Sequence, residues 1–83
     1  MKRLTLRPLA VQDLEDVWFY IAADNPRSAD AMIDMFTDRF ELLRNQPYLG
    51  SICPELDDTI RRLVVQTYNV FYTVTPNAIV IER

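Results

Sequence analysis

The chain has 83 residues, of which 49% are hydrophobic and 25% charged, so it is expected to form one small globular domain over residues 1–83. It has no histidine and one cysteine, which excludes a disulfide framework and disfavours both a zinc site and histidine-dependent hydrolysis. A formal net charge of −3 disfavours direct binding to nucleic-acid phosphates. We therefore predict no metal, no cofactor and no catalytic residues.

The sequence carries no signal for a membrane or for secretion. The N-terminal stretch "MKRLTLRPLAVQDLEDVW" is interrupted by charged residues and contains no long apolar run of the kind that a signal peptide needs. The longest apolar stretches have the length of a strand, so they are too short to span a bilayer. A single cysteine, Cys53, fits a reducing compartment. These features predict a cytoplasmic protein.

A short strand and a helix are predicted at the start of the chain. Residues 3–7, "RLTLR", alternate apolar and polar side chains, as a strand with one buried face does. From about residue 9 to residue 23 the apolar residues recur at helical spacing. On this helix we expect Trp18 in the core and Tyr20 at the edge of the core.

A second helix follows at "DNPRSAD". Asn25 is a good N-cap, and Pro26 fits the first helical position, where a missing N–H has no cost. The helix is expected to end before Pro47, because the residue before a proline avoids the helical conformation. The short connection between the helices predicts an antiparallel helical hairpin.

The second half of the chain is predicted to form a sheet. Residues 48–59 show no periodicity and contain the only glycine, so we expect a long loop there. Three strands follow at residues 60–66, 68–74 and 78–82, and their short connections indicate an antiparallel meander. Tyr68 and the alternate residues after it are expected to face the helices. The predicted fold is α+β with the order β-α-α-β-β-β, a helical hairpin on one face of a small antiparallel sheet.

Five stretches in this order resemble the ParE branch of the ParE/RelE toxin superfamily, the toxins of bacterial type II toxin–antitoxin systems. They are "LAVQDLEDVWFYIAADNPRSAD", "LLRNQPYLG", "PELDDTIRRL", "YNVFYTV" and "IVIER". Members of the superfamily usually continue with a tail similar to V-x-H-G-x-R-D, so the resemblance implies that this chain lacks the usual C-terminal tail. The sheet edge left without that tail is expected to promote concentration-dependent self-association.

The resemblance implies one of two activities. ParE-like members are taken to inhibit DNA gyrase without cutting anything themselves, whereas RelE-like members resemble ribosome-dependent mRNA interferases that rely on basic residues. Here "PELDDT" is acidic where a cleaving site needs cations, and Asn69 stands where RelE-like chains commonly have arginine. Gyrase inhibition is therefore the expectation. An mRNA interferase and an inactive, truncated binding module remain as alternatives.

Three arginines are candidates for contact with the target: Arg61, Arg62 and Arg83. Arg61 and Arg62 are adjacent in a predicted strand, so they are expected to point to opposite faces of the sheet. The one on the helix side needs a carboxylate or carbonyl partner, and Glu55 is a candidate for a structural ion pair with Arg61. That arginine either closes the fold or contacts a partner.

Family resemblance also implies a ParD-like antitoxin that wraps around the toxin. The first helix has apolar side chains beyond its core stripe, and Phe19, Tyr20 and Trp18 are candidates for binding the antitoxin. The alternative is that these aromatic side chains pack on the sheet of the chain itself.

Overall fold

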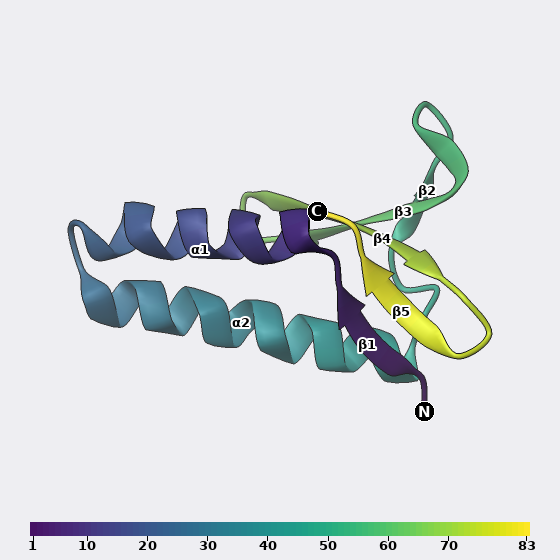
Figure 1. Ribbon diagram of the computed structural model, residues 1–83, viewed down its shortest axis with the longest axis horizontal. Coiled ribbons are helices and arrows are strands. Elements are labelled where there is room, and N and C mark those ends of the chain that lie inside the picture. The colour runs from purple at the N-terminus through teal and green to yellow at the C-terminus, as the bar shows by residue number, and fades with distance from the viewer.

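The computed structural model describes all 83 residues as a helical hairpin against one face of a five-stranded sheet (Figure 1). This is the predicted α+β class, with one more strand than expected. In chain order the elements are β1 (Arg3–Leu6), α1 (Pro8–Ala22), α2 (Pro26–Asn45), β2 (Ser51–Cys53), β3 (Asp57–Val65), β4 (Tyr68–Val74) and β5 (Ala78–Ile81).

The ends of both helices follow from local sequence. Proline is the first residue of α1 and of α2, where its fixed φ suits a helix. The side chain of Asn25 caps α2 by accepting hydrogen bonds from the backbone N–H groups of Arg27 and Ser28, at 3.0 and 3.2 Å. Gln46 then leaves the helical conformation before Pro47. The predicted cap, start and end of α2 are thus confirmed.

The sheet has the strand order β1-β5-β4-β3-β2. Strands β3, β4 and β5 form the predicted antiparallel meander. The sheet as a whole is mixed, because β1 pairs with β5 in parallel, so the expectation of a purely antiparallel sheet is wrong at that edge. Two helices and three strands lie between β1 and β5 in the sequence, and a connection of this length allows the two strands to run in the same direction.

The prediction of a plain loop over residues 48–59 is also wrong. This segment contains β2 and the first residues of β3, which form a hairpin that extends away from the rest of the sheet in Figure 1. Strand β2 has three residues, of which only Cys53 is buried, and its register shifts between Ile52 and Cys53. A strand this short and irregular has no alternation that a sequence pattern could reveal.

The core lies between the helices and the sheet. Tyr68 packs its ring on Phe36 at 5.7 Å between centroids, and Val70 and Tyr72 are buried, so the predicted inner face of β4 is confirmed. The buried cluster consists of Ala10, Phe36, Phe40, Leu43, Leu63, Val65, Val70, Tyr72, Ile79 and Ile81.

Trp18 does not belong to this core, contrary to the prediction. Its side chain is half-buried, and its indole N–H donates a 2.9 Å hydrogen bond to the Asp30 carboxylate, so it joins α1 to α2 near their connection. Tyr20 is 80% exposed, beyond the edge of the core. The reason is visible in Figure 1, where this end of the helical hairpin extends past the sheet.

Neither helix combines the length and the apolar character that crossing a bilayer requires.

Candidate functional site: a groove beside α1 and an anchored loop

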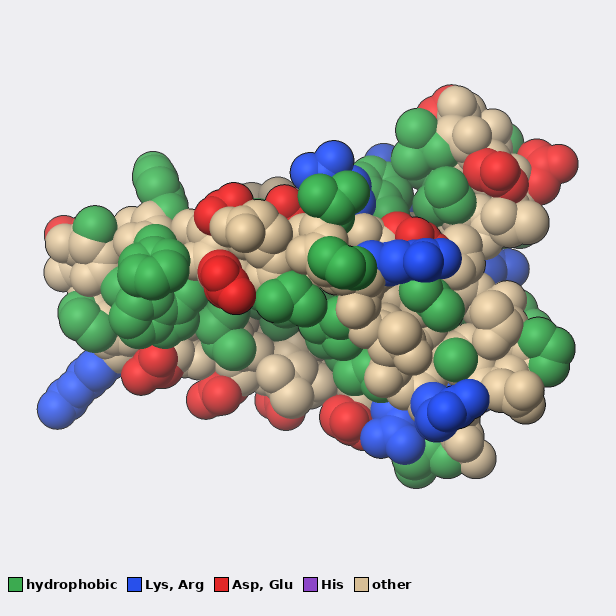
Figure 2. All heavy atoms as spheres, in the orientation of Figure 1, with side chains coloured by type: hydrophobic (Ala, Val, Ile, Leu, Met, Phe, Trp, Pro, Cys, Tyr) green, Lys and Arg blue, Asp and Glu red, His purple; other side chains and the backbone are tan.

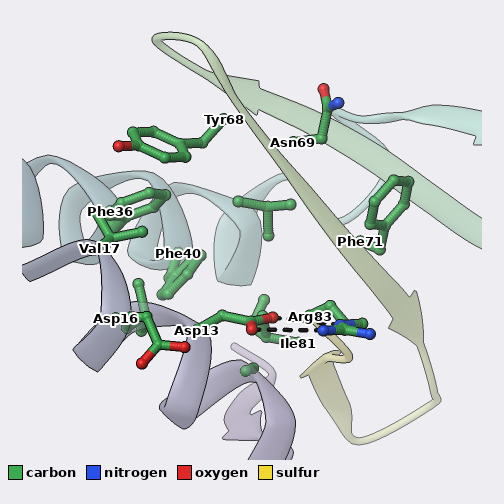
Figure 3. A pocket seen from close by; sticks show the side chains of 13 residues that line it. Asp13, Asp16, Val17, Phe36, Phe40, Tyr68, Asn69, Phe71, Ile81 and Arg83 are labelled. Atoms are coloured by element: carbon green, nitrogen blue, oxygen red, sulfur yellow. Dashed lines mark hydrogen bonds and ion pairs between the residues drawn. The ribbon is translucent and has the colours of Figure 1, made fainter. Parts of the chain in front are cut away.

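A groove of about 510 Å³ lies between α1, α2 and the sheet (Figure 3). It exists because α1 packs along α2 and makes few contacts with the sheet. Nine of its 13 lining residues are hydrophobic, including Leu14 and Val17 of α1, Phe36 and Phe40 of α2, and Val70 and Ile81 of the sheet. The groove can therefore accept apolar side chains.

Charged groups border the groove. Arg83 reaches from the end of the sheet to Asp13 of α1, with its Nε and Nη2 atoms 3.3 and 3.5 Å from the carboxylate (Figure 3). The two side chains are 60% and 39% exposed, so this pair adds at most about 1 kcal/mol and can open readily. Asp16 forms no ion pair and accepts a hydrogen bond from Gln12. The α1 wall of the groove is thus acidic.

An open strand edge also faces the groove. The Phe71 N–H donates to the Arg83 carbonyl at 3.1 Å, and the Phe71 carbonyl accepts from the Glu82 N–H at 2.8 Å. Tyr68, Asn69 and Val70, the first three residues of β4, pair with β3 on one side and with no strand on the other. All three line the groove, so an extended segment lying in it could add to the sheet.

The aromatic side chains proposed for antitoxin binding lie outside this groove, because none of the three is among the residues that line it. Phe19 and Tyr20 are 67% and 80% exposed, so they do not pack on the sheet. Trp18 meets the ring of Phe19 edge-on, with the centroids 5.3 Å apart. Tyr20 follows Asp16 and Val17 by one helical turn, so it continues the α1 wall of the groove. The role of these aromatic side chains stays a prediction, and no sequence pattern indicated the groove itself.

The three candidate arginines occupy separate places. Arg61 is half-buried on the helix side and Arg62 is exposed on the other face. The Nη1 atom of Arg61 donates a 2.7 Å hydrogen bond to the carbonyl of Gly50, a residue just outside β2. The predicted ion pair between Arg61 and Glu55 is not formed, because this carbonyl takes the place of the carboxylate. Arg83 lies across the groove, so the three side chains do not converge.

A buried tyrosine anchors the loop between α2 and β2. The Tyr72 hydroxyl accepts a 2.8 Å hydrogen bond from the Gly50 N–H and donates one of 2.9 Å to the Pro47 carbonyl. Burial raises the pKa of Tyr72. A Cβ on Gly50 would lie 2.7 Å from the Arg62 carbonyl oxygen and from the Tyr72 ring, so only glycine fits. We use the name loop anchor for three hydrogen bonds: the two made by the Tyr72 hydroxyl and the one from Arg61 to the Gly50 carbonyl.

Polar contacts also stabilise the hairpin beyond this loop. The buried Cys53 thiol donates a 3.1 Å hydrogen bond to Glu55, which raises the pKa of the thiol and lowers the pKa of the carboxyl. Asp57 accepts from the backbone N–H and the hydroxyl of Thr59, both at 2.8 Å, and these bonds lower its pKa. No three Cys, Asp or Glu side chains converge into a group that could hold a metal ion.

Comparison with known proteins identifies relatives of the whole chain. Residues 4–83 match the profile of a family described as the ParE toxin of the type II toxin–antitoxin system parDE. A solved structure titled "Chromosomal ParDE TA system from P. aeruginosa" is similar, with a TM-score of 0.80 and 20% sequence identity over 100% of this chain and 92% of that chain. At this identity the structural likeness shows the fold. A search of curated proteins gave no significant match.

Proposed function

We propose that this chain, which belongs to the ParE family of type II toxins, acts by binding and inhibiting DNA gyrase and is neutralised by a ParD-like antitoxin. Membership rests on the family match over residues 4–83. The toxin works through protein contacts in the cytoplasm, where the reduced state of Cys53 is maintained. It needs no cofactor and no catalytic residue for this action.

The placement of the arginines supports binding over RNA cleavage. Cleavage of a message requires cations that converge on the scissile phosphate and stabilise its developing charge. Arg61 is bound to a backbone carbonyl, Arg83 is paired with Asp13, and Arg62 lies on the opposite face of the sheet. A ParE-like mode of action fits this arrangement, and an mRNA interferase does not.

A gyrase supercoiling assay tests the target. Purified toxin is added to gyrase and relaxed plasmid at ratios from sub-stoichiometric to excess, and a parallel reaction contains ribosomes and a message. We expect supercoiling to be lost at stoichiometric toxin while the message stays intact. Unchanged supercoiling at excess toxin would refute the gyrase target, and ribosome-dependent cleavage would establish the interferase alternative.

The groove supports the antitoxin part of the proposal. An extended antitoxin segment pairs with the open edge of β4 and places apolar side chains between α1 and α2. Asp16 has no ion-pair partner, so a lysine or arginine of the antitoxin lies opposite it. From there the antitoxin continues along α1 to the exposed ring of Tyr20.

Two charge reversals on α1 test this placement. Asp16 lines the groove, whereas the neighbouring Glu15 is exposed and does not line it. We expect Asp16→Lys to weaken binding of the antitoxin by about tenfold or more, because like charges across an interface repel, while Glu15→Lys stays close to the wild type. Calorimetry with the product of the adjacent reading frame measures both. Equal effects of the two reversals would rule out this site for the antitoxin.

A further inference from the structure

The hairpin of β2 and β3, with the loop that precedes it, forms an arm that projects from the sheet (Figure 1). Residues 47–58 make up this arm. Its large apolar side chains are mostly in solvent: Tyr48 is 66% exposed, Leu49 42%, Ile52 51% and Leu56 58%. Figure 2 shows apolar and acidic side chains gathered together on it. Apolar surface concentrated in so short a segment is typical of a protein interface.

Part of this surface is organised around Arg61. Its guanidinium carbon lies 4.8 Å from the centroid of the Tyr48 ring, which is a cation–π contact. Ile52 pairs directly with Arg61 across β2 and β3, so both side chains are on the same side of the hairpin. Tyrosine and arginine are the residue types that contribute most to protein interfaces. The remaining donors of Arg61 are free to bind an acceptor on a partner.

The loop anchor holds this surface in place before any partner binds. Gly50 lies between Tyr48 and Ile52, and both its N–H and its carbonyl are bound, to Tyr72 and to Arg61. A loop fixed at its centre loses little conformational entropy on binding, so more of the contact energy appears as affinity. The bonds therefore present exposed side chains in one defined arrangement.

The acidic residues of the arm indicate which kind of partner surface it fits. Glu55 lies in the turn of the hairpin, and Asp57 and Asp58 are the first two residues of β3 directly after that turn. Three carboxylates repel nucleic-acid phosphates and favour a protein surface that carries lysine or arginine. The complementary surface is thus an apolar recess for Ile52 and Leu56 with cations at one end.

We propose that the arm is the surface through which the toxin contacts its protein target, separately from the antitoxin groove. This inference rests on the proposed inhibition of gyrase. The arm and the groove have no residue in common, and β2 is the edge strand of the sheet opposite to β1. The target buries Ile52 and Leu56 in an apolar recess and places its cations against Asp58 and the neighbouring acids.

The double variant Ile52→Ser/Leu56→Ser tests the apolar contact. The matched control is Val64→Ser, because Val64 is 55% exposed on β3 but points to the other face of the sheet. We expect the double variant to need about tenfold more protein to inhibit supercoiling, with antitoxin affinity unchanged, and the control to behave as the wild type. A double variant that inhibits like the wild type would overturn the role of the arm and leave gyrase inhibition standing, whereas a wild type without inhibition would overturn both.

Reversal of a charge at the turn tests the nature of the partner. Asp58 makes no side-chain hydrogen bond, so Asp58→Lys changes charge without removing a structural contact, and Asp34→Lys on the exposed side of α2 is the control. We expect weaker inhibition from Asp58→Lys alone, most clearly at low salt. Stronger inhibition would contradict a basic protein surface and would indicate contact with the DNA phosphates instead.

Discussion

Tyr72→Phe isolates the contribution to stability of the two hydrogen bonds that Tyr72 makes in the loop anchor. The substitution removes one hydroxyl and keeps a ring that is fully buried, with 0% of the residue exposed. Without the hydroxyl, the Gly50 N–H loses its 2.8 Å acceptor and the Pro47 carbonyl loses its 2.9 Å donor. The ring continues to fill its site in the core, so the change in stability reports the two hydrogen bonds alone.

The magnitude follows from the burial of the two partners. An unsatisfied buried donor or acceptor costs about 1–3 kcal/mol. Gly50 is buried, so its N–H bears this cost in full, whereas the half-buried Pro47 can turn its carbonyl to water. We therefore expect a loss of about 2 kcal/mol, which for a domain of this size lowers the Tm by about 8–16 °C.

Thermal and urea unfolding followed by circular dichroism measure this loss. Tyr68→Phe is the matched control, because Tyr68 lies on the same face of the same strand and packs on Phe36, yet its hydroxyl bonds to no protein group. We expect the control to remain within about 0.5 kcal/mol of the wild type. The reasoning fails if Tyr72→Phe is equally neutral, or if both substitutions destabilise the fold to the same extent.

Four further variants or conditions test other contacts. Gly50→Ala should lower stability by about 1–3 kcal/mol in urea, because the new Cβ would meet the Arg62 carbonyl oxygen at 2.7 Å; a neutral result would mean that the loop shifts freely. Asn25→Ala should lose about 1 kcal/mol in thermal melts and Asn25→Gly a few tenths, and equal losses would contradict side-chain capping. The lowered pKa of Asp57 means that its carboxylate stabilises the fold above the unfolded-state pKa of about 3.9, and that this contribution disappears as the pH falls through the lower folded-state pKa. The difference in free energy of unfolding between wild type and Asp57→Asn should accordingly decrease as the pH falls below about 4. A difference that does not change with pH would argue against stabilisation by the Asp57 carboxylate. Because Cys53 is buried and its thiol pKa is raised, iodoacetamide should alkylate it at least about tenfold more slowly in the folded protein than in urea, and similar rates would show that the hairpin opens readily.

Local features of the fold could be predicted from sequence because local chemistry determines them. Asn25 and Pro26 specify the start of α2 whatever surrounds it, and the alternation after Tyr68 reveals the inner face of β4. The short connection expected between the strands at 60–66 and 68–74 is also confirmed, because β3 ends at Val65 and β4 begins at Tyr68. Gln66 makes this turn at a φ of 57°, which is unusual for a residue other than glycine.

The remaining features depend on contacts between distant segments. The parallel pairing of β1 with β5 joins the two ends of the chain, and no local pattern encodes it. The groove arises because α1 packs mainly along α2 and makes few contacts with the sheet, which is a matter of tertiary packing. Arg61 took a carbonyl partner because the loop brings Gly50 close to it. That Gly50 is the only glycine was the one sequence signal that could have identified the anchored loop.

Titration of the antitoxin into a gyrase reaction that the toxin has inhibited tests the central claim most directly. If this ParE-family chain is a gyrase toxin neutralised by a ParD-like antitoxin, supercoiling will be absent with toxin alone and will return as the antitoxin reaches one equivalent. Supercoiling that proceeds normally at excess toxin, or inhibition that persists at excess antitoxin, would contradict the account.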